Sequence, residues 1–129
     1  MYHSRLESRR RILIIDDDKD ILLTFRTCME WLGWEIDLYD DPVKALSEFK
    51  PGYYDRVLTD IRMPKLNGFE LVDRLKALEK SLEVCFITAF EGYYLALKDI
   101  YPRLDAKCFI RKPIGCEELV NHLLLHHKM

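Results

Sequence analysis

The chain has 129 residues, a formal net charge of -2 at pH 7 and 49% hydrophobic residues. This length suits one domain with an ordinary core, and the small charge gives no general reason to expect binding to nucleic acid or to an anionic membrane. There is no signal-peptide pattern and no apolar run approaching ~18 residues, so neither secretion nor a membrane span is indicated. These properties favour a globular protein of the cytoplasm.

The four cysteines, Cys28, Cys85, Cys108 and Cys116, lack the spacing of a metal site or of a CxxC motif. Cys85 and Cys108 lie within apolar runs that are typical of strands, so we expect reduced thiols in or near the core. Reduced thiols agree with a cytoplasmic location.

Residues 1–11 are polar and basic, and we expect them to form a mobile arm in front of a single domain that spans 12–129. The three consecutive arginines Arg9 to Arg11 could contact nucleic acid. Because they are not part of a larger basic face, solvated side chains are the simpler interpretation.

From residue 12 onward, short apolar runs alternate with helical patterns. The run Ile12–Ile15 predicts a strand, and apolar residues at helical spacing predict a helix from about Asp18 to Leu32 that ends at Gly33. Trp31 and Trp34 flank this turn, and we expect both to pack against neighbouring residues.

Cap and turn residues separate the later elements. Asp41 and Pro42 have the preferences of an N-cap and of a first helical position, and Pro51-Gly52 and Pro64 to Gly68 predict turns. The remaining strands are predicted at Glu35–Tyr39, Arg56–Thr59, Val84–Ile87 and Cys108–Arg111, and the remaining helices at about 42–49, 69–79, 91–101 and 116–127.

This alternation predicts an α/β fold in which helices cover both faces of a parallel sheet. Because parallel strands end on a common edge, the side chains that follow several strands should meet there. Asp16, Asp17, Asp60, Thr88 and Lys112 are placed in this way. Three carboxylates, a hydroxyl and an ammonium at one place indicate phosphoryl chemistry assisted by a divalent metal ion.

Four motifs, in this order and spacing, resemble the receiver domain of two-component response regulators. They are ILIIDDD ending at Asp18, VLTDIRMPKLNG ending at Gly68, FITA ending at Ala89 and FIRKP ending at Pro113. The resemblance covers about residues 10–127. It implies a flavodoxin-like (βα)5 three-layer sandwich with a five-stranded parallel sheet of strand order 2-1-3-4-5.

The resemblance also implies roles for individual residues. Asp60 would be the phosphoacceptor, a carboxylate nucleophile. Asp16 and Asp17, together with Asp60 and the backbone carbonyl of Arg62, would bind Mg²⁺, with Mn²⁺ as an alternative ion. In the absence of metal the clustered carboxylates repel one another, so at least one pKa should be raised.

The phosphoryl group would have further partners. Thr88 and Lys112 would contact its oxygens, and the small Ala89 would leave room for it. Phe109 stands at the position of the family's aromatic switch, with an ordinary strand residue as the alternative interpretation. The resemblance implies a cis peptide bond between Lys112 and Pro113, against the low frequency of cis X-Pro bonds.

Arg62 and Phe90 are the residues that would flank the path of the hydrolytic water, two positions after the acceptor and two after the threonine. Neither carries a carboxylate or an amide that could orient a water molecule, and an aromatic ring can exclude it. We therefore expect slow autodephosphorylation.

The chain departs from the family pattern around the fourth helix. The segment from Thr88 to Lys112 is longer than usual, and 102–106 replaces the common Gly-Ala turn. The predicted helix 91–101 is apolar on more than one face, which suggests a second contact. The proposed output residues on it are Tyr93, Tyr94, Leu97 and Tyr101.

These features together predict a phosphorylation-dependent switch rather than an enzyme: a single receiver without an output domain. It would take its phosphate from a histidine kinase or a phosphotransfer protein. A downstream target, or a second copy, would bind the face formed by the fourth helix, the fifth strand and the last helix.

Two other functions stay open. A degenerate receiver could act only as an interaction module, although its acidic, acceptor, hydroxyl and lysine positions are all intact. The other is a haloacid-dehalogenase-like phosphatase, which would carry a second catalytic Asp two residues after the first. This chain has Arg62 at that position, which argues against such an enzyme.

Overall fold

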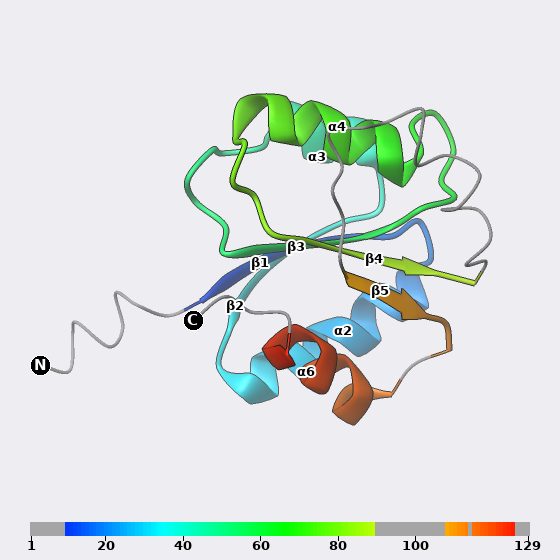
Figure 1. The fold of residues 1–129 in the computed structure, drawn as a ribbon. Coiled ribbons are helices and arrows are strands. Elements are labelled where there is room, and N and C mark those ends of the chain that lie inside the picture. The colour runs from blue at the N-terminus through cyan, green and yellow to red at the C-terminus, as the bar shows by residue number, and fades with distance from the viewer. Residues whose placement is uncertain (1–9, 90–107, 114, 126–129) are drawn as a thin grey trace, which may run out of the picture.

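The computed structural model describes residues 10–89, 108–113 and 115–125 (Figure 1). Residues 1–9 of the predicted arm, the predicted helix 91–101 and the last residues after 125 lie outside the described residues. Arg11, which was predicted to belong to the arm, is the first residue of the first strand. The described elements are β1 (Arg11–Ile15), α2 (Lys19–Leu32), β2 (Glu35–Tyr39), α3 (Pro42–Ser47), β3 (Arg56–Asp60), α4 (Gly68–Leu78), β4 (Val84–Thr88), β5 (Cys108–Arg111) and α6 (Cys116–Leu125).

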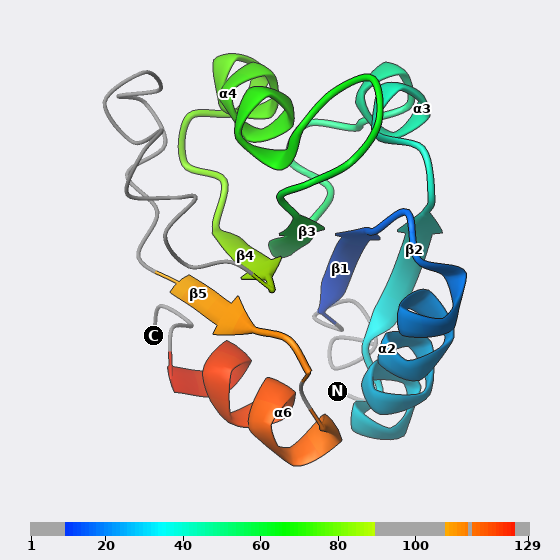
Figure 2. The same ribbon diagram turned by 90° about the vertical axis from the view of Figure 1, so that its right-hand side faces the viewer.

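The strands form one parallel sheet in the order β2-β1-β3-β4-β5. Helices α3 and α4 cover one face of the sheet, and α2 and α6 cover the other (Figures 1 and 2). The predicted fold class and strand order are therefore confirmed. Within the described ranges, each helix is too short or too polar to cross a lipid bilayer.

Local signals fix the ends of α2. The Asp18 side chain caps its first turn by accepting hydrogen bonds from the backbone N–H groups of Asp20 and Ile21. Gly33 ends the helix in the left-handed conformation, with φ of 85°, and its N–H donates to the carbonyl of Glu30 at 3.0 Å. Both ends agree with the prediction.

Helix α3 begins as predicted, with Asp41 as the N-cap and Pro42 at the first position. It ends at Ser47, two residues before the predicted end at Phe49. The Phe49 N–H donates to the carbonyl of Leu46 at 3.3 Å, three residues earlier, so the last turn is tighter than an α-helical turn. Pro51 follows shortly after, and a proline disfavours helical geometry in the residue before it.

The sheet separates two cores. The α3/α4 core lies between the sheet and helices α3 and α4, and Phe69 and Phe86 meet edge to face there with ring centroids 4.9 Å apart. The α2/α6 core lies on the other face and includes Ile12, Phe25 and Leu119. Successive strand residues alternate between the two cores, as expected for a sheet that is covered on both faces.

Both cysteine pairs are joined in disulfides on the α2/α6 side of the sheet, Cys28–Cys116 and Cys85–Cys108. The prediction of reduced thiols is therefore wrong for this structure. Cys85 and Cys108 occupy facing positions of β4 and β5, whereas Cys28 and Cys116 are 88 residues apart in sequence and join α2 to α6. Only the folded topology brings such distant residues together, and spacing along the chain does not reveal it.

Two more side chains lie where the sequence did not place them. Arg56, at the start of β3, is 1% exposed and donates to Cys85 Sγ at 3.5 Å and to the carbonyl of Leu123 at 3.3 Å. Trp31 was expected to pack but is 87% exposed. Trp34 does pack against the α2/α6 core.

Candidate functional site

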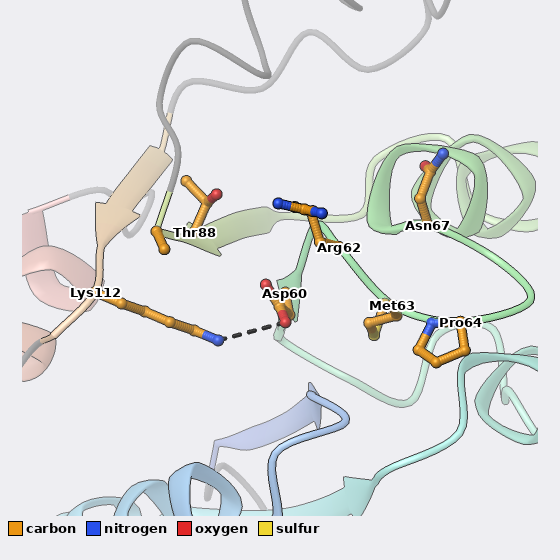
Figure 3. A pocket seen from close by; sticks show the side chains of 8 residues that line it. Asp60, Arg62, Met63, Pro64, Asn67, Thr88 and Lys112 are labelled. Atoms are coloured by element: carbon orange, nitrogen blue, oxygen red, sulfur yellow. Dashed lines mark ion pairs between the residues drawn. The ribbon is translucent and has the colours of Figure 1, made fainter.

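A cavity of about 650 Å³ opens at the carboxyl ends of β3 and β4, beside the residue that follows β5 (Figure 3). This is the edge at which ligands bind in open parallel sheets. Asp60, Thr88 and Lys112, which the sequence predicted to converge, all line the cavity. Its full lining consists of Asp60, Arg62, Met63, Pro64, Asn67, Thr88, Ala89 and Lys112.

Asp60 is the last residue of β3 and is 7% exposed. Its Oδ1 accepts a hydrogen bond from the backbone N–H of Ile61 at 2.8 Å, and its Oδ2 lies 3.3 Å from the ammonium of Lys112. Burial, followed by the charge of Asp16, raises the pKa of Asp60 to about 6, although Lys112 acts in the opposite direction. The sequence predicted a raised pKa from repulsion between the carboxylates; burial is the larger cause, and the charge of Asp16 adds to it.

Asp16 directly follows β1 and is fully buried. Its Oδ1 accepts from the backbone N–H of Asp18 at 2.9 Å, and its Oδ2 lies 3.0 Å from Lys112 Nζ. This ion pair compensates the charge of Oδ2, which has no other partner among the described groups. Burial raises the pKa of Asp16 despite the nearby ammonium.

The acidic residues fit a divalent metal ion. Asp16, Asp17 and Asp60 each offer a carboxylate oxygen, and these atoms lie within 4.8 Å of one another. Asp17 is exposed, whereas Asp16 and Asp60 are buried. Mg²⁺ prefers hard oxygen ligands and keeps several water molecules. Oδ2 of buried Asp16 can coordinate such an ion.

Lys112 reaches the site from the end of β5. Its backbone N–H donates to the carbonyl of Thr88 at 2.9 Å, which fixes the start of its side chain beside the end of β4. Burial by itself would lower the pKa of the ammonium, but pairing with Asp16 and Asp60 raises it overall. The peptide bond to Pro113 is cis, the form that the resemblance implies.

Thr88 is buried at the end of β4, and Ala89 next to it is exposed in the cavity. Phe109 is partly buried, packs against the α3/α4 core and stacks on Phe86 with centroids 5.4 Å apart. Phe90 and the predicted output residues, Tyr93, Tyr94, Leu97 and Tyr101, lie outside the described residues.

The loop after Asp60 supplies lining residues that the sequence did not single out, Met63 and Asn67. Figure 3 shows them, with Pro64, on the side of Asp60 away from Lys112. The Asn67 side chain caps α4 by accepting from the backbone N–H of Glu70 at 2.9 Å. An Asn-Gly pair in front of a helical pattern is a signal that could have found this cap.

Gly68 holds the start of α4 against the acceptor. Its N–H donates to the carbonyl of Ile61 at 2.7 Å. A Cβ atom at this position would collide with the backbone carbonyl oxygen of Asp60 and crowd the Cα of Ile61. Only glycine permits this approach without a backbone shift.

Comparison with known proteins agrees with this geometry. The family model of the response regulator receiver domain matches residues 12–124. The chain is 32% identical over 114 residues to the response regulator receiver protein CpdR of Brucella abortus, a match that covers 88% of this chain and 93% of that protein.

Longer proteins match over a part of their length. The chain is 27% identical to the transcriptional regulatory protein RprY of Bacteroides fragilis, over 88% of this chain and 48% of that protein. It is 30% identical to the sensor protein EvgS of Escherichia coli, over 96% of this chain and 10% of that protein.

Two solved structures show the same fold. The non-phosphorylated HemR receiver domain from Leptospira biflexa is 27% identical, with a TM-score of 0.81 over 94% of this chain and 96% of that one. A CheY-like receiver domain protein from Methanospirillum hungatei is 23% identical, with a TM-score of 0.79 over 92% of this chain and 93% of that one.

Proposed function

Because the chain belongs to the family of response regulator receiver domains, we propose that it is a signalling switch that accepts a phosphoryl group on Asp60. Receiver domains are phosphoacceptor signalling domains rather than enzymes in the usual sense. One observation carries the proposal: the Asp60 carboxylate ends β3 at the cavity, 3.3 Å from the ammonium of Lys112.

The transfer requires an ionised Asp60. A carboxylate oxygen attacks phosphorus, the bond from phosphorus to the donor breaks, and the donor leaves as acetate from acetyl phosphate or as imidazole from a phosphohistidine. The raised pKa of Asp60, about 6, makes its carboxylate more basic than usual and still leaves it mostly ionised at pH 7. Lys112 provides positive charge next to the incoming phosphate.

We assign the metal site to Asp16, Asp17, Asp60 and the backbone carbonyl of Arg62, with Mg²⁺ as the ion and Mn²⁺ as an alternative. When bound, the ion would neutralise charge on the acceptor and on the phosphoryl oxygens. The three carboxylates and Lys112 support this assignment, because two charges from the ion and one from the lysine balance three negative charges.

Thr88, Ala89 and Phe109 would respond to the phosphoryl group. The Thr88 hydroxyl would donate to one phosphoryl oxygen, and Ala89 lines the same cavity without filling it. Phe109 stacks on Phe86, so an inward movement of its ring would have to displace an aromatic contact of the α3/α4 core. We propose that this contact opposes the switch in the unphosphorylated state.

The lifetime of the phosphoryl group would depend on Arg62 and Phe90. Arg62 is exposed and lines the cavity beside the acceptor, where its guanidinium can donate hydrogen bonds but cannot accept a proton from water. Replacing Arg62 with Asn and Phe90 with Glu should accelerate loss of phosphate. We expect slow decay in the unchanged protein.

A histidine kinase or a phosphotransfer protein is the proposed donor, which places the switch in the cytoplasm, where kinases use ATP. The output would leave through the face formed by Tyr93, Tyr94, Leu97 and Tyr101 with β5 and α6, toward a protein target or a second copy. Tyr94→Glu should weaken that association without affecting phosphorylation of Asp60.

Mass spectrometry after incubation with acetyl phosphate and Mg²⁺ tests the acceptor. We expect one phosphate adduct on the wild type, none on Asp60→Asn and none in excess EDTA. Asp20→Asn is the matched control, since it makes the same substitution at an exposed residue of α2 outside the cavity. An adduct on Asp60→Asn at the wild-type level would overturn the assignment, and no adduct on the wild type would favour an interaction module.

A further inference from the structure

The two disulfides differ in their access to solvent. Cys85 and Cys108 are 0% and 2% exposed and lie at facing positions of β4 and β5, in the α2/α6 core. Cys28 is also buried, at 2%, but its partner Cys116 is an exposed residue at the first position of α6. Thiol–disulfide exchange requires access to one of the two sulfurs. A reductant can therefore approach Cys28–Cys116 from solvent but not Cys85–Cys108.

The accessible disulfide is tied to the phosphorylation site at both ends. Asp16 leads through the cap of α2 to Cys28, and Lys112 leads through one short connection to Cys116. Asp16 and Lys112 are themselves joined by the 3.0 Å ion pair. The two chain segments, from Asp16 to Cys28 and from Lys112 to Cys116, are thus joined at both ends: by the ion pair at the site and by the disulfide at the other end.

The space between these two segments is not fully packed. A second cavity, of about 370 Å³, lies between α2 and the segment after β5, and Ile21, Phe25, Lys112 and Pro113 are part of its lining. Packing between α2 and the residues that follow β5 is therefore incomplete at this cavity. The disulfide is the covalent link that fixes their separation.

We propose that Cys28–Cys116 is a redox switch: its opening lets the chain that follows Lys112 shift relative to α2, which displaces the Lys112 ammonium from Asp16 and Asp60 and slows phosphorylation. The proposal rests on the proposed function of Asp60. It also rests on the proposed cytoplasmic location, because a disulfide in the reducing cytosol is usually transient and either catalytic or redox-sensing.

The chemical step is exchange with a dithiol, either dithiothreitol or a protein with a reactive cysteine pair. One reductant thiolate attacks the sulfur of Cys116, and Cys28 leaves as a thiolate and takes up a proton. The second thiol of the reductant then attacks the mixed disulfide, which releases Cys116 and leaves the reductant as a disulfide. Two electrons pass to the protein, and an oxidised dithiol can reverse the reaction.

Graded treatment with dithiothreitol, followed by alkylation and peptide mass spectrometry, tests which bond opens. We expect Cys28 and Cys116 to be alkylated at reductant levels that leave Cys85 and Cys108 paired. Acetyl phosphate labelling with Mg²⁺ should then be severalfold slower than in the oxidised protein and should recover on reoxidation. Cys116→Ser, a change at an exposed residue, should react at the reduced rate and be insensitive to reductant.

The outcomes separate the two proposals. Equal labelling rates in the oxidised and reduced proteins would overturn the switch and leave Asp60 as the acceptor. Alkylation of all four cysteines before any reductant is added, or opening of both bonds at the same reductant level, would overturn the switch as well. No phosphate adduct in either redox state would overturn the acceptor and the switch together.

Discussion

Both layers of helices pack against the sheet, but they differ in the links that add to this packing. The α3/α4 core depends on side-chain packing, centred on the Phe69 and Phe86 rings. The α2/α6 side contains both disulfides and the buried guanidinium of Arg56. The division extends to the site, because the loop after Asp60 leads to α4, whereas Asp16 leads to α2 and Lys112 to α6. Packing therefore anchors the acceptor loop, whereas a disulfide adds to the packing of the two helices that follow Asp16 and Lys112.

The strongest test of this difference is Phe69→Ala, in the α3/α4 core. Phe69 is fully buried, so its truncation should lower the free energy of unfolding by about 3–5 kcal/mol through lost burial and a cavity. Leu78→Ala on the same helix is the control: Leu78 is 54% exposed, and its loss should change stability by about 0.5 kcal/mol or less. Urea unfolding of both variants measures the effects, and equal losses would contradict the assignment of the core.

On the opposite face, removal of the Cys28–Cys116 bond should cost about 2–4 kcal/mol, because the bond closes a loop between residues 88 apart in sequence. The double replacement Cys28→Ala and Cys116→Ser, compared with the oxidised wild type, measures it. A loss well below 1 kcal/mol would show that this layer is also held by packing alone.

The third test concerns the charges between the layers, in metal-free protein. Asp60 has a folded-state pKa of about 6 against an ordinary value of 3.8, so the folded state binds its proton more tightly than the unfolded state. Its contribution is most favourable below about pH 4 and is lost as the pH rises through about 6.

Asp60→Asn should therefore be more stable than the wild type at pH 7 in EDTA, by on the order of 1–3 kcal/mol. The difference should vanish below about pH 4, and saturating Mg²⁺ should reduce it by stabilising the wild type. Thermal unfolding across this pH range is the measurement. A variant less stable than the metal-free wild type at pH 7 would refute the inference that the ionised Asp60 carboxylate destabilises the folded state.

The smallest expected effect distinguishes the two tryptophans. Trp31→Ser should change the unfolding free energy by about 0.5 kcal/mol or less, since the ring is 87% exposed. Trp34→Ser should cost more, because Trp34 packs against the α2/α6 core. In addition, the Arg10 guanidinium carbon lies over the Trp34 ring, 5.8 Å from the ring centroid. Unfolding of the two variants in parallel compares them.

The sequence predicted what depends on local pattern. Alternating apolar runs identified the strands, capping residues such as Asp41 and Gly33 marked helix ends, and the strand-end positions of Asp60 and Lys112 indicated the site. The strand order needed the family resemblance, because alternation alone allows other orders.

What the sequence could not predict depends on contacts between distant segments. Cys28 and Cys116 pair only because α2 and α6 share one face of the sheet. An arginine at a strand start usually points to water, and the burial of Arg56 follows from the arrival of α6, whose Leu123 carbonyl accepts from it. The exposure of Trp31 likewise depends on which helical face meets the sheet, and the last turn of a helix gives a weak signal of that face.

Gly68 has a consequence for how the site can be altered. Its missing side chain lets α4 begin against the carbonyl of Asp60, so the position sets the shape of the site without contributing any charge. Gly68→Ala would leave every ionisable group in place while pushing the acceptor backbone or the helix aside. Gly68→Ala would therefore displace the Asp60 backbone without removing its carboxylate, whereas Asp60→Asn removes the charge and keeps the shape. Comparison of the two variants would separate the effects of shape and charge on signalling.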